Sequence, residues 1–161
     1  MSELDTQFVT FDLAGQIYGV RVTAVSEIIR MVGMSKAPET LPFVVGLVNI
    51  RGDIVPVVDM RTRLHLERGE YSLATPIIVT RIDGTSVGLI VDQVLEVVTL
   101  SDSTIERPNS MFTKSQCLVG VAKVKAKMIF LIDLHGIFSA DEAELIEQLA
   151  AVQPIGAEAL A

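Results

Sequence analysis

The chain has 161 residues, half of them hydrophobic, with a mean hydropathy of +0.49 and a formal net charge of −7. Its apolar runs all fall short of the roughly 18–20 residues that span a bilayer, and the N-terminus lacks the basic start and apolar core of a secretion signal. The acidic balance, the lack of Trp and the aromatic content of 5% argue against nucleic-acid binding. Cys117 is the single cysteine and fits a reducing compartment, so we expect a cytoplasmic protein without membrane insertion.

Tight turns divide the first part of the chain into short elements. Residues 8–13 and 16–22 are predicted strands, joined by a two-residue turn at Ala14-Gly15. In residues 23–30, TAVSEIIR, apolar side chains recur at helical spacing, which predicts a short helix capped by its first residue. The glycine and prolines of residues 33–42 predict a loop.

The stretch GLVNIRGDIVPVVDMRTRL, residues 46–64, contains two apolar runs around one turn. Residues 44–50 and 54–58 are rich in Val, Ile and Leu and are predicted to be largely buried strands. Gly52 supplies the permissive backbone for the reversal next to Arg51. Asp59 follows the second run, and its carboxylate is placed to cap the first turn of a helix.

The second half is predicted to use similar elements. They are, in order, a hairpin of residues 75–82 and 85–92 around Asp83-Gly84, a loop over residues 101–116, and a strand pair at residues 118–124 and 128–132. Lys123, Lys125 and Lys127 alternate, which would place them on one face of a strand, and we interpret them as a solvated edge. Ser139 and Glu142 have capping-box spacing and open an amphipathic helix predicted over residues 140–152.

The sequence resembles itself at two offsets. At an offset of 69 (88 − 19), five positions match in order: Gly15, Gly19, Val22, Val25 and Glu27 fall on Gly84, Gly88, Val91, Val94 and Glu96. At an offset of 74 (120 − 46), Gly46 falls on Gly120 and Asp59 on Asp133. This order predicts an internal duplication, with approximate repeat units at residues 7–66 and 75–139. Many short strands closed by tight turns then predict two small barrels, with a binding groove where they meet.

Catalytic and metal-binding patterns are missing from the sequence. Asp59 and Asp133 occupy matching places before a helical turn, so one capping role explains both better than a catalytic pair. His65 and His135 are isolated, and Cys117 has no local partner that would activate it. We therefore expect no metal, no cofactor and no enzyme activity, but a rigid β body that works by surface recognition.

Four segments resemble one family. GLVNIRGDIVPVVDMR resembles the signature of CheW-like chemotaxis coupling proteins, in which an apolar strand runs into an Asn-x-Arg-Gly turn and a Pro-containing strand ending in Asp. FVTFDLAGQIYGVRVTAVSEII looks like the opening hairpin of the family, VGLIVDQVLEVV like its second hairpin, and LVGVAKVKAKMIFLIDLHGIF like its final strand pair. The resemblance covers about residues 7–150, so residues 1–161 are predicted to form a single CheW-like domain.

The resemblance implies a fold, a function and partners. The fold would be mainly β, with two SH3-like five-stranded β-barrels, short helices and a C-terminal helix. Family members are adaptors that link transmembrane chemoreceptors to the histidine kinase CheA, whose regulatory domain is itself CheW-like. The receptor tip binds in the groove between the barrels, and the kinase domain packs end-on through barrel edges. Carried over position by position, Arg51, Gly46, Val25 and Glu27 are expected on the receptor side, in a cytoplasmic protein at membrane-associated receptor arrays.

Several alternatives remain open from the sequence. Arg51 either contacts a partner through its planar guanidinium or bonds within its own barrel, where Glu27 is a possible acceptor. The chain could instead serve another chemosensory pathway, such as one controlling pili or development, or bind a small ligand between the barrels. An enzyme would need Asp59 and Asp133 within reach of each other in an open cleft.

Overall fold

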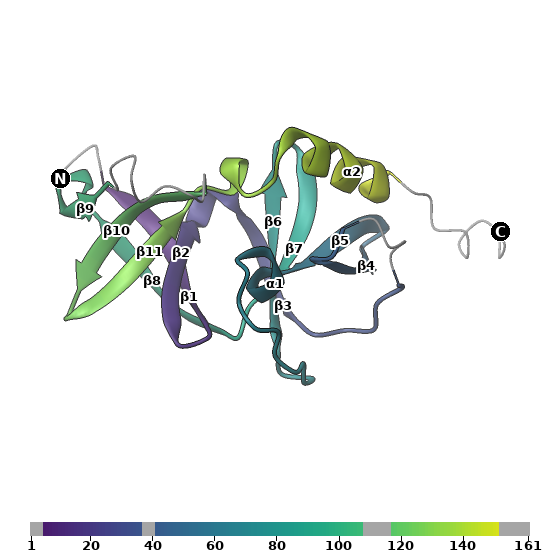
Figure 1. The fold of residues 1–161 in the computed structure, drawn as a ribbon, viewed down its shortest axis with the longest axis horizontal. Coiled ribbons are helices and arrows are strands. Elements are labelled where there is room, and N and C mark those ends of the chain that lie inside the picture. Colours follow the sequence, from purple (N-terminus) through teal and green to yellow (C-terminus); the bar gives the residue numbers. More distant parts are fainter. Residues whose placement is uncertain (1–4, 37–40, 108–116, 152–161) are drawn as a thin grey trace, which may run out of the picture.

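Two barrels lie side by side along the long axis of the molecule (Figure 1). The computed structural model describes residues 5–36, 41–107 and 117–151. One sheet has six strands in the order β8 (Gln93–Leu100), β1 (Thr6–Leu13), β2 (Gln16–Arg21), β11 (Lys127–Ile132), β10 (Leu118–Val124) and β9 (Ile105–Glu106). The other has five strands in the order β3 (Val25–Arg30), β6 (Pro76–Ile82), β7 (Thr85–Ile90), β5 (Asp53–Asp59) and β4 (Val44–Ile50). The predicted mainly β fold of two small barrels is confirmed.

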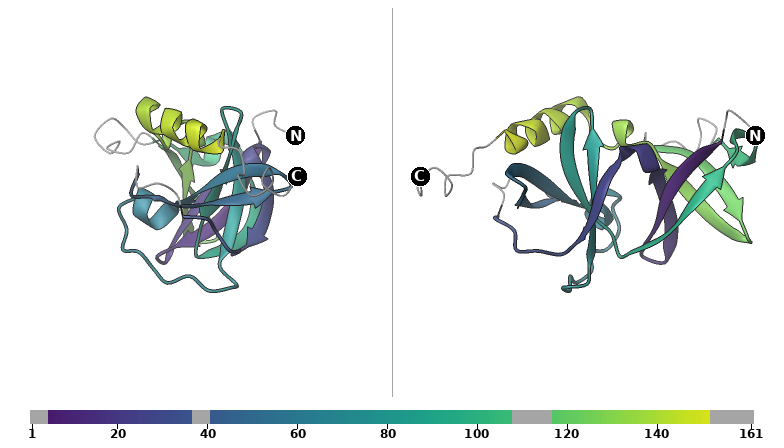
Figure 2. Two further views of the ribbon diagram at one scale, coloured as in Figure 1. Left: turned by 90° about the vertical axis from the view of Figure 1, so that its right-hand side faces the viewer. Right: turned by 180° about the vertical axis from the view of Figure 1, so that it is seen from behind.

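Short helices connect the strands at a few points. They are η1 (Val22–Ala24), α1 (Met60–Arg63), η2 (Asp102–Thr104) and η3 (Leu134–Gly136), followed by the longer α2 (Ala140–Ala150). Figure 2 shows α2 lying across the five-stranded barrel. No helix among the described residues is long and apolar enough to cross a membrane.

The two barrels exchange strands. The β1–β2 hairpin pairs with β8 and β11, whereas β3, which follows it directly in the chain, pairs with β6 of the other sheet. Pairings in one sheet recur in the other at the two offsets found in the sequence. Gly19 lies opposite Leu131 in one parallel pair, and their counterparts at these offsets, Gly88 and Val57, lie opposite each other in the other pair. The pairing therefore gives the molecule a pseudo-twofold relation between its barrels.

One strand differs from the expected count of five per barrel. β9 pairs with β10 at Val121 and forms the last strand at one edge of the six-stranded sheet. The counterpart of Val121 is Leu47, which pairs with Pro56 of β5 on one side and, on the other, has an isolated bridge to Ser35 in place of a strand. The short strand β9 lies within the predicted loop of residues 101–116, of which residues 108–116 lie outside the described ranges.

Among the described residues, four two-residue hairpin turns have both central residues in the left-handed region. Their first residues have φ between 49° and 52° and their second residues φ between 66° and 90°, at Ala14-Gly15, Arg51-Gly52, Asp83-Gly84 and Lys125-Ala126. Such turns match the right-handed twist of the strands that they join. Because Lys125 lies in a turn, the expectation that three lysines share one strand face is wrong: the chain reverses between Lys123 and Lys127.

The predicted helix over residues 23–30 is also wrong. Only η1 (Val22–Ala24) is helical, and β3 follows it. In β3, half-buried and exposed residues alternate strictly, which is the two-residue period of a strand, and β6 supplies the backbone hydrogen bonds. Ile28 and Ile29, which suggested a helical stripe, therefore point to opposite sides of the sheet.

The main hydrophobic core joins the two barrels. Its fully buried members include Phe11 and Leu13 from β1, and Ile78 and Leu89 from β6 and β7. Of two smaller clusters, one is built on strands of the six-stranded sheet and the other on strands of the five-stranded sheet. Because one core is built by strands of both sheets, the barrels are packed against each other as one unit.

The C-terminal helix α2 seals one side of this core. Ser139 accepts a hydrogen bond from the Glu142 N–H, and the Glu142 carboxylate accepts one from the Ser139 N–H, so the predicted capping box is confirmed. Ile146 and Leu149 are buried against the five-stranded barrel. Residue 152, the last of the predicted stripe, lies outside the described residues.

Candidate functional site

Arg51 stands at the first position of the β4–β5 turn with φ 52°. Its Nη1 donates to Oε2 of Glu27, on β3, at 2.6 Å. The Arg51 side chain is nevertheless 79% exposed, whereas that of Glu27 is 24% exposed. The turn itself is held by Asn49, whose Oδ1 accepts from the Gly52 N–H at 2.9 Å. The structure thus gives Arg51 an acceptor within its own barrel and leaves most of its guanidinium accessible to solvent.

Gly46 is buried inside the wall of the five-stranded barrel. Ser35 and Leu47 exchange backbone hydrogen bonds of 2.9 and 2.7 Å beside it and close the barrel. A Cβ on Gly46 would lie 2.9 Å from Cβ of Met34 and 3.0 Å from the Ser35 carbonyl oxygen. Val25 is half-buried against the main core. Gly46 therefore belongs to the barrel wall, and Val25 packs on the core two residues before Glu27 in β3.

The two matching aspartates begin helical turns. Asp59 is 1% exposed and accepts from the Thr62 N–H at 3.2 Å, at the start of α1. Asp133 accepts from the His135 N–H at 3.0 Å, at the start of η3. Their contacts are those of caps, which satisfy backbone donors that the first turn leaves free. Among the described residues, no group of three or more His, Cys, Asp or Glu side chains could hold a metal ion.

Asp59 also contacts two side chains of the loop that follows α1. The Tyr71 hydroxyl donates to the Asp59 carboxylate, and Arg68 Nε lies 3.5 Å from the same oxygen. Burial, reinforced by this bond to Asp59, raises the pKa of Tyr71 to about 12. Sequence reasoning missed this contact because nothing local links Tyr71 to a carboxylate 12 residues earlier.

A second unforeseen contact ties the two barrels together. The Arg61 guanidinium donates to both oxygens of Asp92, at 2.8 and 2.5 Å, and the Ala14 N–H donates to the same carboxylate at 2.9 Å. The pKa of Asp92 is lowered chiefly by the bond from Arg61, and that of Arg61 is raised by the same bond. Because Ala14 belongs to the β1–β2 turn and Arg61 to α1, the bond fixes the two barrels relative to each other.

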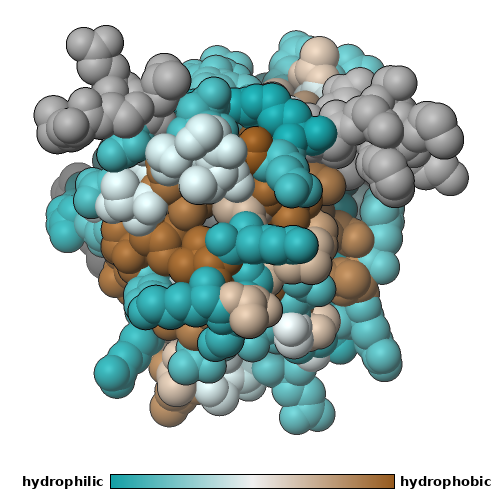
Figure 3. Space-filling model, turned by 90° about the vertical axis from the view of Figure 1, so that its left-hand side faces the viewer, coloured by the Kyte–Doolittle hydropathy of each residue, from teal (hydrophilic) through white to brown (hydrophobic). Residues whose placement is uncertain are grey.

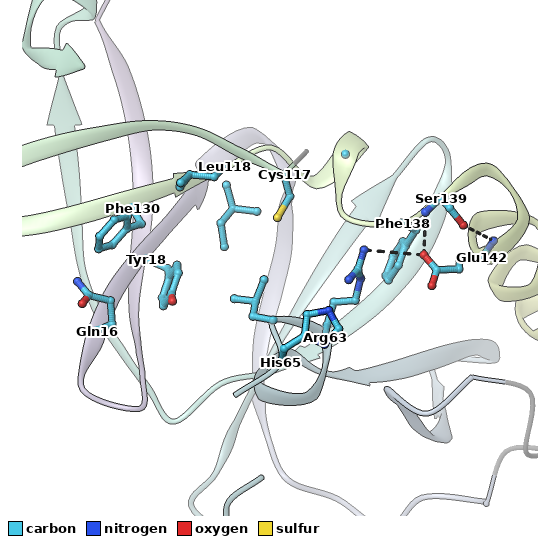
Figure 4. A pocket seen from close by; sticks show the side chains of 13 residues that line it. Gln16, Tyr18, Arg63, His65, Cys117, Leu118, Phe130, Phe138, Ser139 and Glu142 are labelled. Carbon is cyan, nitrogen blue, oxygen red and sulfur yellow. Dashed lines mark hydrogen bonds and ion pairs between the residues drawn. The ribbon is translucent and has the colours of Figure 1, made fainter. Parts of the chain in front are cut away.

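A cleft of about 570 Å³ opens where the barrels meet. Figure 4 shows Tyr18, Phe130 and Leu118 on the side of the six-stranded barrel, and Arg63 and Phe138 on the other side. The Tyr18 and Phe130 rings lie 5.9 Å apart, and burial raises the pKa of Tyr18. The predicted groove at the junction is thus present, but Arg51, Glu27, Val25 and Gly46 do not line it.

The fold and the site define a class of protein. Two barrels with a common core present an exposed, preoriented arginine and a cleft lined by both apolar and polar side chains, and the acidic side chains act as caps and ties. This arrangement suits a binding scaffold.

Comparisons with known proteins give the family. The model of the CheW-like domain family matches residues 7–142, so the chain belongs to this family. The chemotaxis protein CheW of Rhizobium meliloti is 32% identical over 141 residues, which cover 86% of this chain and 90% of the relative. That of Klebsiella aerogenes is 29% identical over 147 residues, covering 89% and 88%. The crystal structure of the scaffolding protein TtCheW from Thermoanaerobacter tengcongensis matches with a TM-score of 0.78 and 36% identity, over 85% of this chain and 94% of that one.

The family decides between the alternative activities that the sequence left open. The chain is a non-enzymatic adaptor of chemotaxis signal transduction. An enzyme that uses Asp59 and Asp133 is thereby excluded, and a small-ligand-binding domain is not favoured.

Proposed function

We propose that this adaptor couples the cytoplasmic tip of chemoreceptors to the regulatory domain of the histidine kinase CheA. It would do so in the cytoplasm, at membrane-associated receptor arrays. The observation that carries the proposal is the exposed guanidinium of Arg51, held at 2.6 Å by Glu27 on the outside of the five-stranded barrel.

Arg51 has the chemistry for a helical partner. Its planar guanidinium has five donors, and the bond to Glu27 uses Nη1 and leaves the other nitrogens free to bind acidic side chains or the free carbonyls at a helix end. Glu27 orients the side chain before binding, which lowers the entropic cost of the contact. The proposed receptor side also includes Gly46, in the barrel wall, and Val25, half-buried against the main core.

A second surface suits the kinase contact. Figure 3 views the molecule from the end formed by the six-stranded barrel, and apolar side chains gather in the middle of that face among hydrophilic ones. The same sheet carries exposed apolar residues on β8 and β11, namely Leu95, Val97 and Met128. Apolar surface rimmed by polar groups is typical of protein interaction sites. Two separate surfaces would let one molecule hold both partners at once.

The turn of the other barrel offers a matched control for the receptor contact. Lys125 is the counterpart of Arg51 at the second offset of the repeat and holds the same position of the corresponding turn. We expect Arg51→Ala to weaken binding of a receptor cytoplasmic fragment at least about tenfold, or about 1.4 kcal/mol, in calorimetric titrations. Lys125→Ala should stay within about twofold of the wild type, since one exposed charge outside an interface contributes little. A wild-type affinity in folded Arg51→Ala would refute the proposed receptor contact.

A further inference from the structure

We infer that a second cavity, lined by Arg21 of β2, Arg81 of β6 and Arg107 directly after β9, binds the phosphate group of a small phosphate ester. Its volume is about 490 Å³, which is within the range of small-ligand sites. Neither Arg51 nor Glu27 lines this cavity. The site would therefore add a ligand to the adaptor and does not depend on the proposed receptor contact.

This cavity is distinct from the cleft described above. Successive residues of a strand point to opposite faces of the sheet. On β10, Leu118 lines the cleft and Val119 lines the cavity. On β11, Phe130 lines the cleft and Leu131 lines the cavity, and among the described residues Ile132 alone borders both. The cavity thus lies on the other face of these two strands.

The repeat gives this cavity a counterpart in the other half of the molecule. A smaller cavity of about 280 Å³ has among its lining residues Asp59, Arg61, Thr75, Ile90 and Asp92. At the two offsets of the repeat, their counterparts are Asp133, His135, Thr6, Arg21 and Thr23, which all line the larger cavity. The two cavities therefore occupy matching places of the pseudo-twofold arrangement, and their side chains can be compared position by position.

In the smaller cavity, carboxylates of the chain itself satisfy the guanidinium. Arg61 donates to both oxygens of Asp92. This bond to Asp92 raises the pKa of Arg61 most, and the nearby charges of Asp59 and Asp12 raise it further. The place where an anion would bind is thus already taken by internal acidic groups.

The charges at the matching positions of the larger cavity are different. The counterparts of Asp92, Ile90 and Asp12 are Thr23, Arg21 and Arg81. Among the described residues, the side chains of Arg21 and Arg81 form no ion pair. Two guanidinium groups therefore stand where the other half has a carboxylate and an apolar side chain, and an external anion fits the place that Asp92 fills there.

Charge and geometry favour a phosphate group as this anion. A phosphate monoester carries a charge of about −1.5 to −2 at pH 7, which matches the two unpaired guanidinium groups. Its oxygens can accept two N–H donors from each planar fork, and the hydroxyls of Thr6 and Thr23 add further donors at the same cavity. A single carboxylate has only two oxygens and one negative charge, so it would leave part of this set unsatisfied.

The rest of the lining suits an organic group attached to the phosphate. Arg107 is already bonded to Asp102 at 2.8 Å and to the Val119 carbonyl oxygen at 3.3 Å, so it contributes positive charge from a fixed position. Phe8 supplies apolar wall. The carboxylate of Asp133 also lines the cavity and has acceptor capacity left for a hydroxyl or amino group. This mixture favours a phosphate ester over inorganic phosphate.

The test titrates adenosine monophosphate into the ¹⁵N-labelled full chain at constant ionic strength, so that charge screening does not change. We expect saturable NMR shifts centred on β2, η1 and β9, with a dissociation constant below about 1 mM. Inorganic phosphate should shift the same signals with lower affinity, and acetate should not. Receptor and kinase are absent, so the result does not depend on the proposed coupling function.

Variants of the protein locate the site. Arg21→Ala and Arg81→Ala, both at exposed positions, should each weaken binding at least about fivefold, because each removes one charged donor group. Arg30→Ala removes an exposed arginine of β3 outside the cavity and should stay within about twofold of the wild type. Thr23→Asp supplies the carboxylate that the other half has in Asp92, and it should abolish binding while the fold stays intact.

Three results would overturn the inference. The first is no saturable shift at the cavity with adenosine monophosphate. The second is an equal loss of affinity in Arg30→Ala and Arg21→Ala, or undiminished binding in Thr23→Asp, either of which would mean nonspecific attraction to positive charge. The third is tighter binding of a phosphoserine peptide than of adenosine monophosphate, which would make the ligand a modified protein.

Discussion

The pair Arg51–Glu27 allows the two roles of Arg51 to be separated by a double-mutant cycle. The variants are Arg51→Ala, Glu27→Gln and the double substitution. If Arg51 serves mainly to hold its own turn, its loss should lower stability and leave binding unchanged. If it serves a partner, binding should fall while the fold stays intact.

The structure sets the expected size of the stability effect. The bond is short, at 2.6 Å, but the Arg51 side chain is 79% exposed, and such ion pairs contribute about 0.2–1 kcal/mol. For a chain of this length, that corresponds to a decrease in Tm of at most about 4 °C. Ala tolerates the positive φ of the turn no worse than Arg does, because both carry a Cβ, so the substitution adds little backbone strain.

Urea denaturation and receptor binding, measured on the same four proteins, complete the cycle. We expect each single variant to lose less than about 1 kcal/mol of unfolding free energy. Receptor binding should fall about tenfold or more in Arg51→Ala and less in Glu27→Gln, which removes only the orienting partner. Two results together would refute this reasoning. One is a loss of about 2 kcal/mol or more of unfolding free energy in Arg51→Ala, well above the range of an exposed ion pair. The other is an equal loss of receptor affinity in both single variants.

Three further substitutions test the supporting contacts. Tyr71→Phe removes the donor to the buried Asp59 carboxylate and should cost about 1–3 kcal/mol in urea denaturation. Asp92→Asn should lower the free energy of unfolding by about 1–2 kcal/mol at pH 7. Because the bond from Arg61 lowers the pKa of Asp92, this stability difference from the wild type should persist below about pH 3.9, the approximate pKa of an ordinary Asp. In acid titrations it should vanish only as the pH falls through the lowered pKa. Gly46→Ala forces a Cβ against Met34 and should lower stability by about 1–3 kcal/mol, with a matching drop in Tm.

Local chemistry made the hairpins predictable from sequence. Ala14-Gly15, Arg51-Gly52 and Asp83-Gly84 each place a glycine where the turn requires positive φ, and apolar runs flank them. The capping box at Ser139 is equally local. The Lys125-Ala126 turn lacks this signal, so the strand pair around it was predicted without its turn residues, and the alternating lysines were interpreted as one face of a strand.

Strands β3 and β8 were the hardest elements to predict because their partners are distant in the sequence. β3 pairs with β6, which follows only after the whole β4–β5 hairpin, and β8 pairs with β1 at the start of the chain. In β3, the sequence VSEII fits a helical period as well as a strand period, and only the exchange of strands between barrels decides in favour of the strand.

The candidate site was predictable in part. The resemblance pointed to Arg51 and Glu27, and the structure brings them into contact across 24 residues of sequence. The resemblance also pointed to Gly46, which the structure places in the barrel wall. There the absence of a side chain lets Ser35 approach and close the barrel. The ties Arg61–Asp92 and Tyr71–Asp59 could not be predicted, since they depend on how the two barrels and the loop after α1 come together.

The most direct test of the adaptor function is co-sedimentation of this protein with a receptor cytoplasmic fragment and CheA, combined with a kinase assay. We predict a ternary complex that contains all three proteins and a kinase activity higher than that of CheA with receptor alone. Recovery of only binary complexes, or a kinase activity that this protein leaves unchanged, would contradict the account.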